Sequence, residues 1–274
     1  MAEPDANPLE NVFVAERDSS LTGYVTLCLR PEAALDRIGA VGIVHPDWRR
    51  QGIGTALMQR ATQRAQQLKR ERLTYLEMSV RERVAGAPEL AQALGLRPVR
   101  FFYYMECHDL KHLPEPAFPP GIRLRHYALG QDEEAFVPAY NDGFSDHWGY
   151  VPHTLEKERH RVHAPGFRAE DNLLAVDADG TIAGLCLLLF QKVEGHALSS
   201  QPPMIDDLAV AHAYRQRGIG RALLLTGMRR IRDEGFAAAS LAVDADNPNK
   251  ALRLYESVGF RIISRSTAYR KELD

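Results

Sequence analysis

The sequence predicts an α/β (α+β) protein made of two tandem domains, each with a mixed central β-sheet flanked by helices, the first abbreviated at its N-terminus. The chain has 274 residues, a length that suits two domains, each with its own core. One phrase with two glycines occurs twice, as "RRQGIGTALM" from Arg49 and as "RQRGIGRALL" from Arg215. The order of predicted strands and helices around the two copies is the same, at an offset of about 165 residues.

The segment "HLPEPAFPPG", which begins at His112, separates the two copies. Its prolines lack a backbone N–H and cannot continue a regular helix. We therefore expect an N-terminal domain over residues 1–114, a Pro-rich linker over 115–120 and a C-terminal domain over 121–274.

The first half opens with "NVFVAERDSSLTGYVTLCLR", two apolar runs around a polar turn that ends in glycine, which predicts a β-hairpin. The strand "IGAVGIV" follows, and then the glycine phrase. After that phrase, apolar residues recur at helical spacing and predict an amphipathic helix. "TYLEMSV", "APELAQALGL" and a final apolar segment predict strand, helix and strand. The helix stripe consists of Ile53, Leu57, Met58, Ala61, Ala65 and Leu68.

The second half repeats this order, with a hairpin in "NLLAVDADGTIAGLCLLLFQ", a strand in "IDDLAV", a helix after the glycine phrase, and then "ASLAVDA" and "NKALRLYESVGF". Ile219, Leu223, Met228 and Ile231 form its helix stripe. A strand in "GIRLRHYA" and helices over 131–145 and 154–163 precede the hairpin. The first half has no such lead, so either that domain is naturally shorter or the sequence begins late; both readings stay open.

The composition excludes several functional classes. The chain is 45% hydrophobic and 26% charged, with a formal net charge of −2, so it lacks the basic excess of nucleic-acid-binding proteins. No apolar run approaches the roughly 20 residues that a membrane helix needs, and the start lacks a secretory signal, so we expect a cytoplasmic protein with neither nucleic-acid nor membrane partners. Cysteine and histidine spacing predicts no metal. The residues concerned are Cys28, Cys107, Cys186, His153, His160 and His163.

The glycine phrase predicts an anion site. Gly218 and Gly220 stand where a strand turns into a helix, and without a Cβ they let a ligand approach backbone N–H groups. The helix dipole attracts negative charge, and Arg215, Arg217 and Arg221 add formal positive charge. A phosphate group is the natural ligand.

Two common phosphate motifs do not fit. A P-loop needs a lysine and a hydroxyl after its last glycine, and a dinucleotide fingerprint needs a third Gly or Ala where Leu57 and Leu223 stand. What remains is R-x-x-G-x-G. With "IDDLAV", Asn247 and "ALRLYESVGF", it resembles the GNAT acetyltransferase superfamily, whose cofactor loop reads [QR]-x-x-G-x-[GA]. Over the whole chain the arrangement is similar to that of mycothiol synthase and its relatives.

The resemblance implies acetyl-CoA as cosubstrate, with pantetheine lying along the strand before the loop and a backbone N–H near Leu208 to Val210 facing the oxyanion. Asn247 also reads as a helix cap, and both readings can hold. The implied cofactor-binding residues are Leu208, Ala209, Val210, Arg215, Gln216, Arg217, Gly218, Ile219, Gly220, Arg221 and Asn247, with Arg49, Gly52 and Gly54 in the first domain.

The resemblance places Tyr255 beside the sulfur of CoA. A phenol with a pKa of about 10 can protonate a leaving thiolate whose thiol has a pKa of about 8.5. The alternative is a core tyrosine. Many relatives carry a glutamate base where Met204 stands; strand alternation puts Asp206 on the same face and Asp207 on the opposite one. Asp206 is therefore the first candidate base and Asp207 the second, with a solvated pair, a water relay or bulk water as alternatives.

The segment "FSDHWGY" joins the two leading helices, and the resemblance implies that it walls the acceptor pocket. His147, Trp148 and Tyr150 are the candidate substrate residues. The alternative is that they serve only packing.

The first half lacks the corresponding chemistry. Alignment on the final glycines puts Ala91 where Tyr255 stands and Arg83 where Asn247 stands, and "IGAVGIV" contains no carboxylate. We therefore expect a degenerate N-terminal domain and an acetyl-CoA-dependent N-acetyltransferase in the C-terminal one, acting on a small primary amine by direct transfer. A mycothiol-synthase-like acetylation of a cysteinyl amine and a non-catalytic acyl-CoA-binding regulator remain alternatives. The sequence predicts no oligomeric state.

Overall fold

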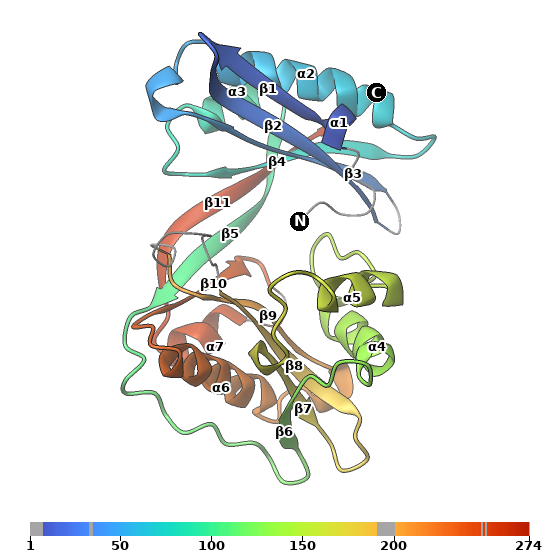
Figure 1. Ribbon diagram of the computed structural model, residues 1–274, viewed down its shortest axis with the longest axis vertical. Coiled ribbons are helices and arrows are strands. Elements are labelled where there is room, and N and C mark those ends of the chain that lie inside the picture. Colours follow the sequence, from blue (N-terminus) through green and yellow to red (C-terminus); the bar gives the residue numbers. More distant parts are fainter. Residues whose placement is uncertain (1–7, 33–34, 191–200, 248, 250, 274) are drawn as a thin grey trace. The chain divides into compact units, whose positions relative to one another are not determined.

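The computed structural model describes residues 8–32, 35–190, 201–247, 249 and 251–273. The chain forms two compact units: one comprises Met1–Phe102 and Ser264–Asp274, the other Tyr103–Ile263. The chain passes into the second unit within strand β5 (Arg97–Cys107) and returns to the first within β11 (Arg261–Glu272) (Figure 1).

The first unit contains a mixed sheet. Helix α1 (Pro8–Asn11) leads into the hairpin of β1 (Val12–Arg17) and β2 (Ser20–Pro31), and β3 (Asp36–Val44) pairs antiparallel with β2. Strand β4 (Thr74–Arg81) then pairs parallel with β3 and antiparallel with the second half of β11. Helices α2 (Ile53–Leu68) and α3 (Ala87–Ala93) precede and follow β4.

The predicted apolar stripe packs α2 onto this sheet. Leu57, Met58, Ala61 and Ala65 are buried in one cluster with β2 and β3, while Ile53 and Leu68 pack at its edge and are partly buried. Burial of such side chains stabilises the unit by about 25 cal/mol for each Å² of apolar surface removed from water.

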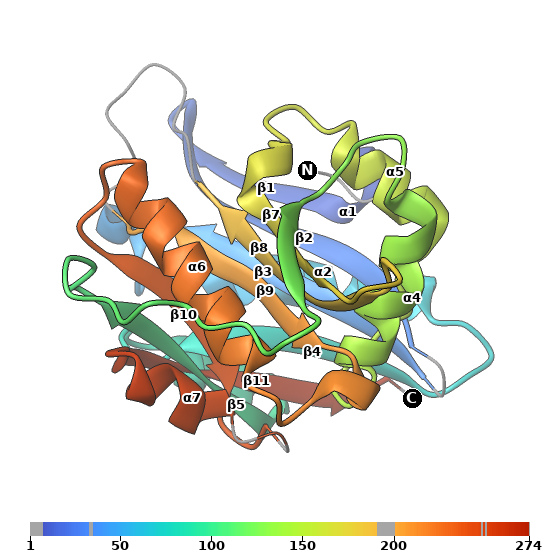
Figure 2. The ribbon, with the colours of Figure 1, turned by 90° about the horizontal axis from the view of Figure 1, so that it is seen from below.

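The second unit has the longer lead. Strands β6 (Arg123–His126), β7 (Asn172–Val176), β8 (Ile182–Leu189) and β9 (Met204–Val210) pair antiparallel in succession, and β10 (Ala239–Asp244) is parallel to β9. Within this unit, Figure 2 shows α6 (Ile219–Asp233) on one side of β7 to β9 and α4 (Glu133–Phe144) with α5 (Leu155–Val162) on the other. Helix α7 (Ala251–Ser257) packs in the same core cluster as α6.

The two faces of this sheet bury separate cores. The α6 face holds Ile219, Leu223, Met228 and Ile231, which confirms the predicted stripe. The α4 face is aromatic and includes Phe136 and Phe144. Beneath it the fully buried Glu158 accepts hydrogen bonds from Arg161 at 2.7 and 2.9 Å and contacts a ring nitrogen of His153 at 2.8 Å. These contacts fix α5, whose first turn is capped by Thr154.

The predicted order of elements is confirmed in both halves, including the lead strand and the two leading helices of the second. Of the predicted elements, Gln191 at the end of the second hairpin and Lys250 at the start of the last helix lie outside the described residues. Within the described part of the chain, every helix is too short or too polar to cross a bilayer.

The final strand predicted for each half extends into the other unit. Residues Ser266–Glu272 of β11 pair with β4 of the first unit, while Met105 and Cys107 of β5 are buried in the core of the second. The Pro-rich segment belongs to the second unit, where Leu113 is buried and its carbonyl accepts a hydrogen bond from Arg229 at 3.2 Å. An apolar strand pattern predicts burial but not the partner strand.

Candidate active site

The glycine phrase before α6 forms an open left-handed turn. Gly218 has φ 85° and ψ −4°, and Gln216 before it has φ 62°. The first helical hydrogen bond runs from the Ala222 N–H to the Gly218 carbonyl at 3.0 Å, so the N–H groups that precede it have no helical partner. A Cβ built on Gly218 would meet no atom within 4 Å. The space beside the Cα of Gly218 is therefore open.

The phrase before α2 has the same geometry. Gly52 has φ 82° and ψ −9°, Arg50 has φ 62°, and a Cβ on Gly52 would also meet nothing within 4 Å. The first arginine of each phrase also makes the same hydrogen bond. Arg49 Nε donates to the Val44 carbonyl at 3.2 Å, and Arg215 Nε donates to the Val210 carbonyl at 3.1 Å.

Strands β9 and β10 separate immediately after they pair. They are in parallel register only at Met204 with Ser240 and Ile205 with Leu241. Residues 206–210 therefore lie beyond the last pair, on an edge where an extended ligand can add main-chain hydrogen bonds as a further strand would. Leu208 and Val210 pack their side chains against the α6 core, and Ala209 packs on the α4 face. The strand segment predicted to bind pantetheine therefore lies beyond the last residue pair of β9 with β10.

A β-bulge places the two carboxylates. The pairing of β9 with β8 runs from Leu187 with Asp207 directly to Leu188 with Ile205, so Asp206 is the extra residue. The expectation that strict alternation sends Asp206 and Asp207 to opposite faces is not met, because the bulge interrupts the alternation. Asp207 lies toward α4, where the Tyr140 hydroxyl donates to its Oδ2 at 3.2 Å.

Both carboxylates are harder to ionise than usual. Burial, and after it the charge of Asp206, raises the pKa of Asp207 to about 7, against the lowering effect of the Tyr140 hydrogen bond and Arg161. Desolvation by surrounding protein also raises the pKa of Asp206, although this side chain is exposed at the surface. A carboxyl group that titrates near neutrality can accept a proton and release it at working pH.

Tyr255 lies on α7 with only 9% of its surface exposed, and its ring packs edge-on against Phe260 at 6.2 Å. Burial, followed by the charges of Cys186 and Asp207, raises the pKa of its phenol above the ordinary value of 10. Among the described residues, its hydroxyl has no hydrogen-bond partner. The candidate acid is therefore neutral at physiological pH and near enough to the candidate base for their charges to interact.

The guanidinium of Arg215, a predicted cofactor-binding residue, makes four hydrogen bonds within the described part of the protein. Its guanidinium donates to the carbonyls of Val210 and Gly143, to Asp146 at 2.6 Å and to Asn249 at 3.3 Å. These contacts engage both terminal nitrogens and connect the turn to the end of α4. Arg215 therefore braces the turn against α4.

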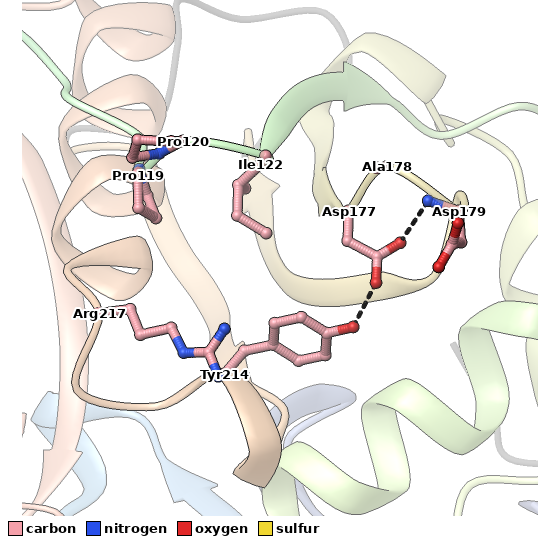
Figure 3. Close-up of a pocket in the computed structure, with 9 residues that line it drawn as sticks. Pro119, Pro120, Ile122, Asp177, Ala178, Asp179, Tyr214 and Arg217 are labelled. Carbon is pink, nitrogen blue, oxygen red and sulfur yellow. Dashed lines mark hydrogen bonds between the residues drawn. The ribbon is translucent and has the colours of Figure 1, made fainter.

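The remaining predicted residues lie around this turn. The Asn247 side chain accepts from the Asn249 N–H at 2.8 Å, as a local cap does. A pocket of about 280 Å³ lies beside the turn. Figure 3 shows residues that line it, with Arg217 over the ring of Tyr214. The Tyr214 hydroxyl donates to Asp177 at the tip of the β7–β8 hairpin. No role for this pocket followed from the sequence.

The segment between α4 and α5 contains the candidate acceptor residues. The Tyr150 hydroxyl donates to Asn141 at 2.8 Å, and the His147 ring packs edge-on against Phe144 at 5.0 Å. Desolvation by the surrounding protein lowers the pKa of His147, because it disfavours the charged imidazolium. Trp148 lies between them in the chain. Within the described part of the chain, no three His, Cys, Asp or Glu side chains gather as a metal site would require.

Tyr140 is the residue that sequence reasoning missed. Phe136, Tyr140 and Phe144 recur every four residues along α4; Phe136 and Phe144 are buried, and Tyr140 is partly buried against the same cluster. A tyrosine in such a stripe carries a hydroxyl that needs a partner when buried. That pattern was the available signal, but the partner lies far away in the sequence, on β9.

Comparisons with known proteins agree with this geometry. The model of the acetyltransferase (GNAT) family matches residues 118–260, and that of the acetyltransferase (GNAT) domain matches residues 8–95. A mycothiol acetyltransferase from Thermomonospora curvata is 33% identical over 250 residues, which cover 89% of this chain and 76% of the relative.

Two solved structures are similar over nearly the whole chain. A GCN5-related N-acetyltransferase from Sphaerobacter thermophilus has a TM-score of 0.76 at 28% identity, over 96% of this chain and 81% of that one. A tandem GNAT protein from the clavulanic acid biosynthesis pathway has a TM-score of 0.70 at 19% identity, over 95% and 82%, and is similar in fold.

Proposed function

Because this chain belongs to the GNAT acetyltransferase family and is an acetyl-CoA-dependent N-acetyltransferase, we propose that its C-terminal unit transfers the acetyl group directly to a small primary amine. The observation that carries the proposal is the concurrence, in one unit, of an open N–H turn, two strands that separate after two residue pairs, and Tyr255 near Asp207.

The turn before α6 binds the diphosphate of the cosubstrate through the N–H groups of residues 219–221, and the dipole of α6 adds to the attraction. The edge of β9 beyond Ile205 holds the pantetheine arm as an added strand. An N–H of residues 208–210 faces the oxyanion, where a fixed donor is worth about 3 kcal/mol in the transition state. Acetyl-CoA supplies the activated thioester.

The net reaction releases one proton. One proton of the acceptor ammonium passes to the Asp206–Asp207 pair, and the nitrogen lone pair then attacks the thioester carbon. As the carbon–sulfur bond breaks, Tyr255 gives its proton to the sulfur. The nitrogen loses its second proton as the amide forms, and this proton restores the phenol of Tyr255. The aspartate pair then releases the first proton to water, so one net proton is released. All groups return to their starting states.

We propose that the first unit is catalytically degenerate. Its counterpart of Tyr255 is Ala91, which is fully buried in α3. Its counterparts of Asp206 and Asp207 are Ala40 and Val41, and β3 pairs with β2 without a bulge. The unit keeps the open turn at Gly52 and supports the fold, and it can bind CoA without turning it over.

A cysteinyl amine is the second candidate acceptor, because the Thermomonospora curvata relative is named a mycothiol acetyltransferase. A non-catalytic acyl-CoA-binding role, which the sequence alone left open, is not proposed, since family membership makes the chain an enzyme.

The test is thiol release from acetyl-CoA with a panel of simple primary amines and cysteine-derived amines. Gly218→Val and Gly52→Val form a matched pair, since both put a β-branched residue at φ above 80° and store on the order of 1–3 kcal/mol of strain. We expect Gly218→Val to abolish turnover and Gly52→Val to keep the wild-type rate. Equal loss from both, or no turnover by the wild type with any amine, contradicts the proposal.

A further inference from the structure

We propose that Asp207 is the general base of the C-terminal unit and that Tyr140 is a positioning residue that holds its carboxylate, an inference that rests on the proposed function. The sequence favours Asp206 instead. The choice of Asp207 over Asp206 follows from the bulge in β9 and from the contact of α4 with this strand.

The bulge decides which carboxylate is fixed. Asp206 is the unpaired extra residue of β9, and its side chain is exposed. Asp207 is in register with Leu187 of β8 and is half-buried under α4. A base must be held within hydrogen-bond reach of the proton that it removes, and the paired, half-buried residue is the one whose position the fold determines.

Tyr140 is itself rigid. Its ring packs between Phe144, at a centroid distance of 4.6 Å, and His153, at 4.9 Å. The helix that carries it lies tight on β9, because a Cβ on Gly143 would come within 2.7 Å of the Ala209 Cβ. Its hydroxyl donates to Oδ2 of Asp207. Among the described residues no hydrogen bond to the other carboxylate oxygen, Oδ1, is formed, and this oxygen is the one that receives the proton of the acceptor ammonium.

The groups around Asp207 shift the pKa of its carboxyl in opposite directions. The Tyr140 hydrogen bond and the charge of Arg161 stabilise the carboxylate, whereas burial and the charge of Asp206 disfavour it. Burial raises the pKa values of Cys186 and Tyr255, and the charge of Asp207 adds to both shifts. The titratable groups that face it are therefore Asp206 on β9, Tyr140 on α4, Arg161 on α5, Cys186 on β8 and Tyr255 on α7.

These directions make opposite predictions for two variants. Tyr140→Phe keeps the ring but removes the donor, so the pKa of Asp207 rises by about 0.5–1 unit. Asp206→Asn removes the neighbouring charge, so the pKa falls by about one unit. Asp207→Asn removes the base and lowers the rate by about 10²- to 10⁴-fold.

The experiment combines two readouts on the whole protein. The carboxyl carbon of Asp207 is titrated by ¹³C NMR without substrate, and the acid limb of kcat/KM is measured with one amine for every variant. Tyr127→Phe is the matched control, because it removes a hydroxyl from the same aromatic cluster and leaves the hydrogen bond from Tyr140 to Asp207 in place. We expect both midpoints to move up in Tyr140→Phe, down in Asp206→Asn and not at all in Tyr127→Phe.

A midpoint unmoved in Tyr140→Phe, even with a lowered rate, overturns the positioning role, because a purely structural effect would not change an ionisation. A rate loss in Asp206→Asn as large as that in Asp207→Asn overturns the choice of base. Absence of turnover by the wild type would contradict the proposed function, and the NMR titration would still decide whether Tyr140 controls Asp207.

Discussion

Replacing Tyr255 with Phe removes one hydroxyl and separates a catalytic acid from a core tyrosine. The ring packs among Val258, Phe260 and the α6 core, and Phe keeps all of those contacts. Because the hydroxyl has no hydrogen-bond partner among the described residues, its loss should change the free energy of unfolding by less than about 1 kcal/mol.

The expected effect on the rate is much larger. Loss of a positioned proton donor lowers the rate of the chemical step by about 10²- to 10⁴-fold, or on the order of 3–5 kcal/mol in the barrier. Since burial raises the pKa of Tyr255 above 10, the donor stays protonated through the neutral range, and the loss should be the same at every pH from about 6 to 9.

The assay is single-turnover acetyl transfer by rapid quench, with CoA affinity and thermal unfolding measured on the same samples. Tyr269→Phe is the control, because Tyr269 is a buried tyrosine of the first unit, clustered with Ala91. We expect the control to keep the wild-type rate. A Tyr255→Phe enzyme that is as fast as wild type, or a loss shared by both variants, would refute the assignment of Tyr255 as the acid.

Two further predictions concern stability. The hydrogen bonds from Arg161 and His153 overcome the effect of burial and lower the pKa of Glu158 to about 2, so their stabilisation is present above the unfolded-state pKa of about 4.3 and is lost as the pH falls toward 2. Between pH 6 and pH 2.5, the free energy of urea unfolding should therefore fall by about 2 kcal/mol more for the wild type than for Glu158→Gln; equal losses would contradict this. Gly143→Ala should destabilise the protein by about 1 kcal/mol, because the contact with Ala209 at 2.7 Å outweighs the helix propensity gained, and an unchanged melting temperature would mean that α4 does not pack so closely on β9.

Local patterns predicted the elements that depend on neighbouring residues. The strand-to-helix turns at the two glycine phrases, the stripes of α2 and α6 and both hairpins follow from residue type and spacing within short windows. Such features depend on backbone sterics and on a periodicity that the sequence displays directly.

Features that depend on a distant partner were not predictable. The bulge at Asp206 is defined by the register of β9 against β8, and strict alternation therefore misassigned the neighbouring carboxylate. The contacts of Arg215 with Asp146 and Gly143 also join residues that lie far apart in the sequence. The pairing of β11 with β4 joins strands nearly two hundred residues apart, and no pattern within either strand encodes that choice.

The most direct test of the central claim is a titration of the protein with CoA, followed by the ¹H–¹⁵N signals of its backbone amides. We expect the amides of residues 219–221 to shift most strongly, together with those of β9 from Leu208 to Val210, as the diphosphate and pantetheine occupy the turn and the strand edge. If CoA binds while these amides stay unchanged, the cofactor site lies elsewhere and the account is contradicted.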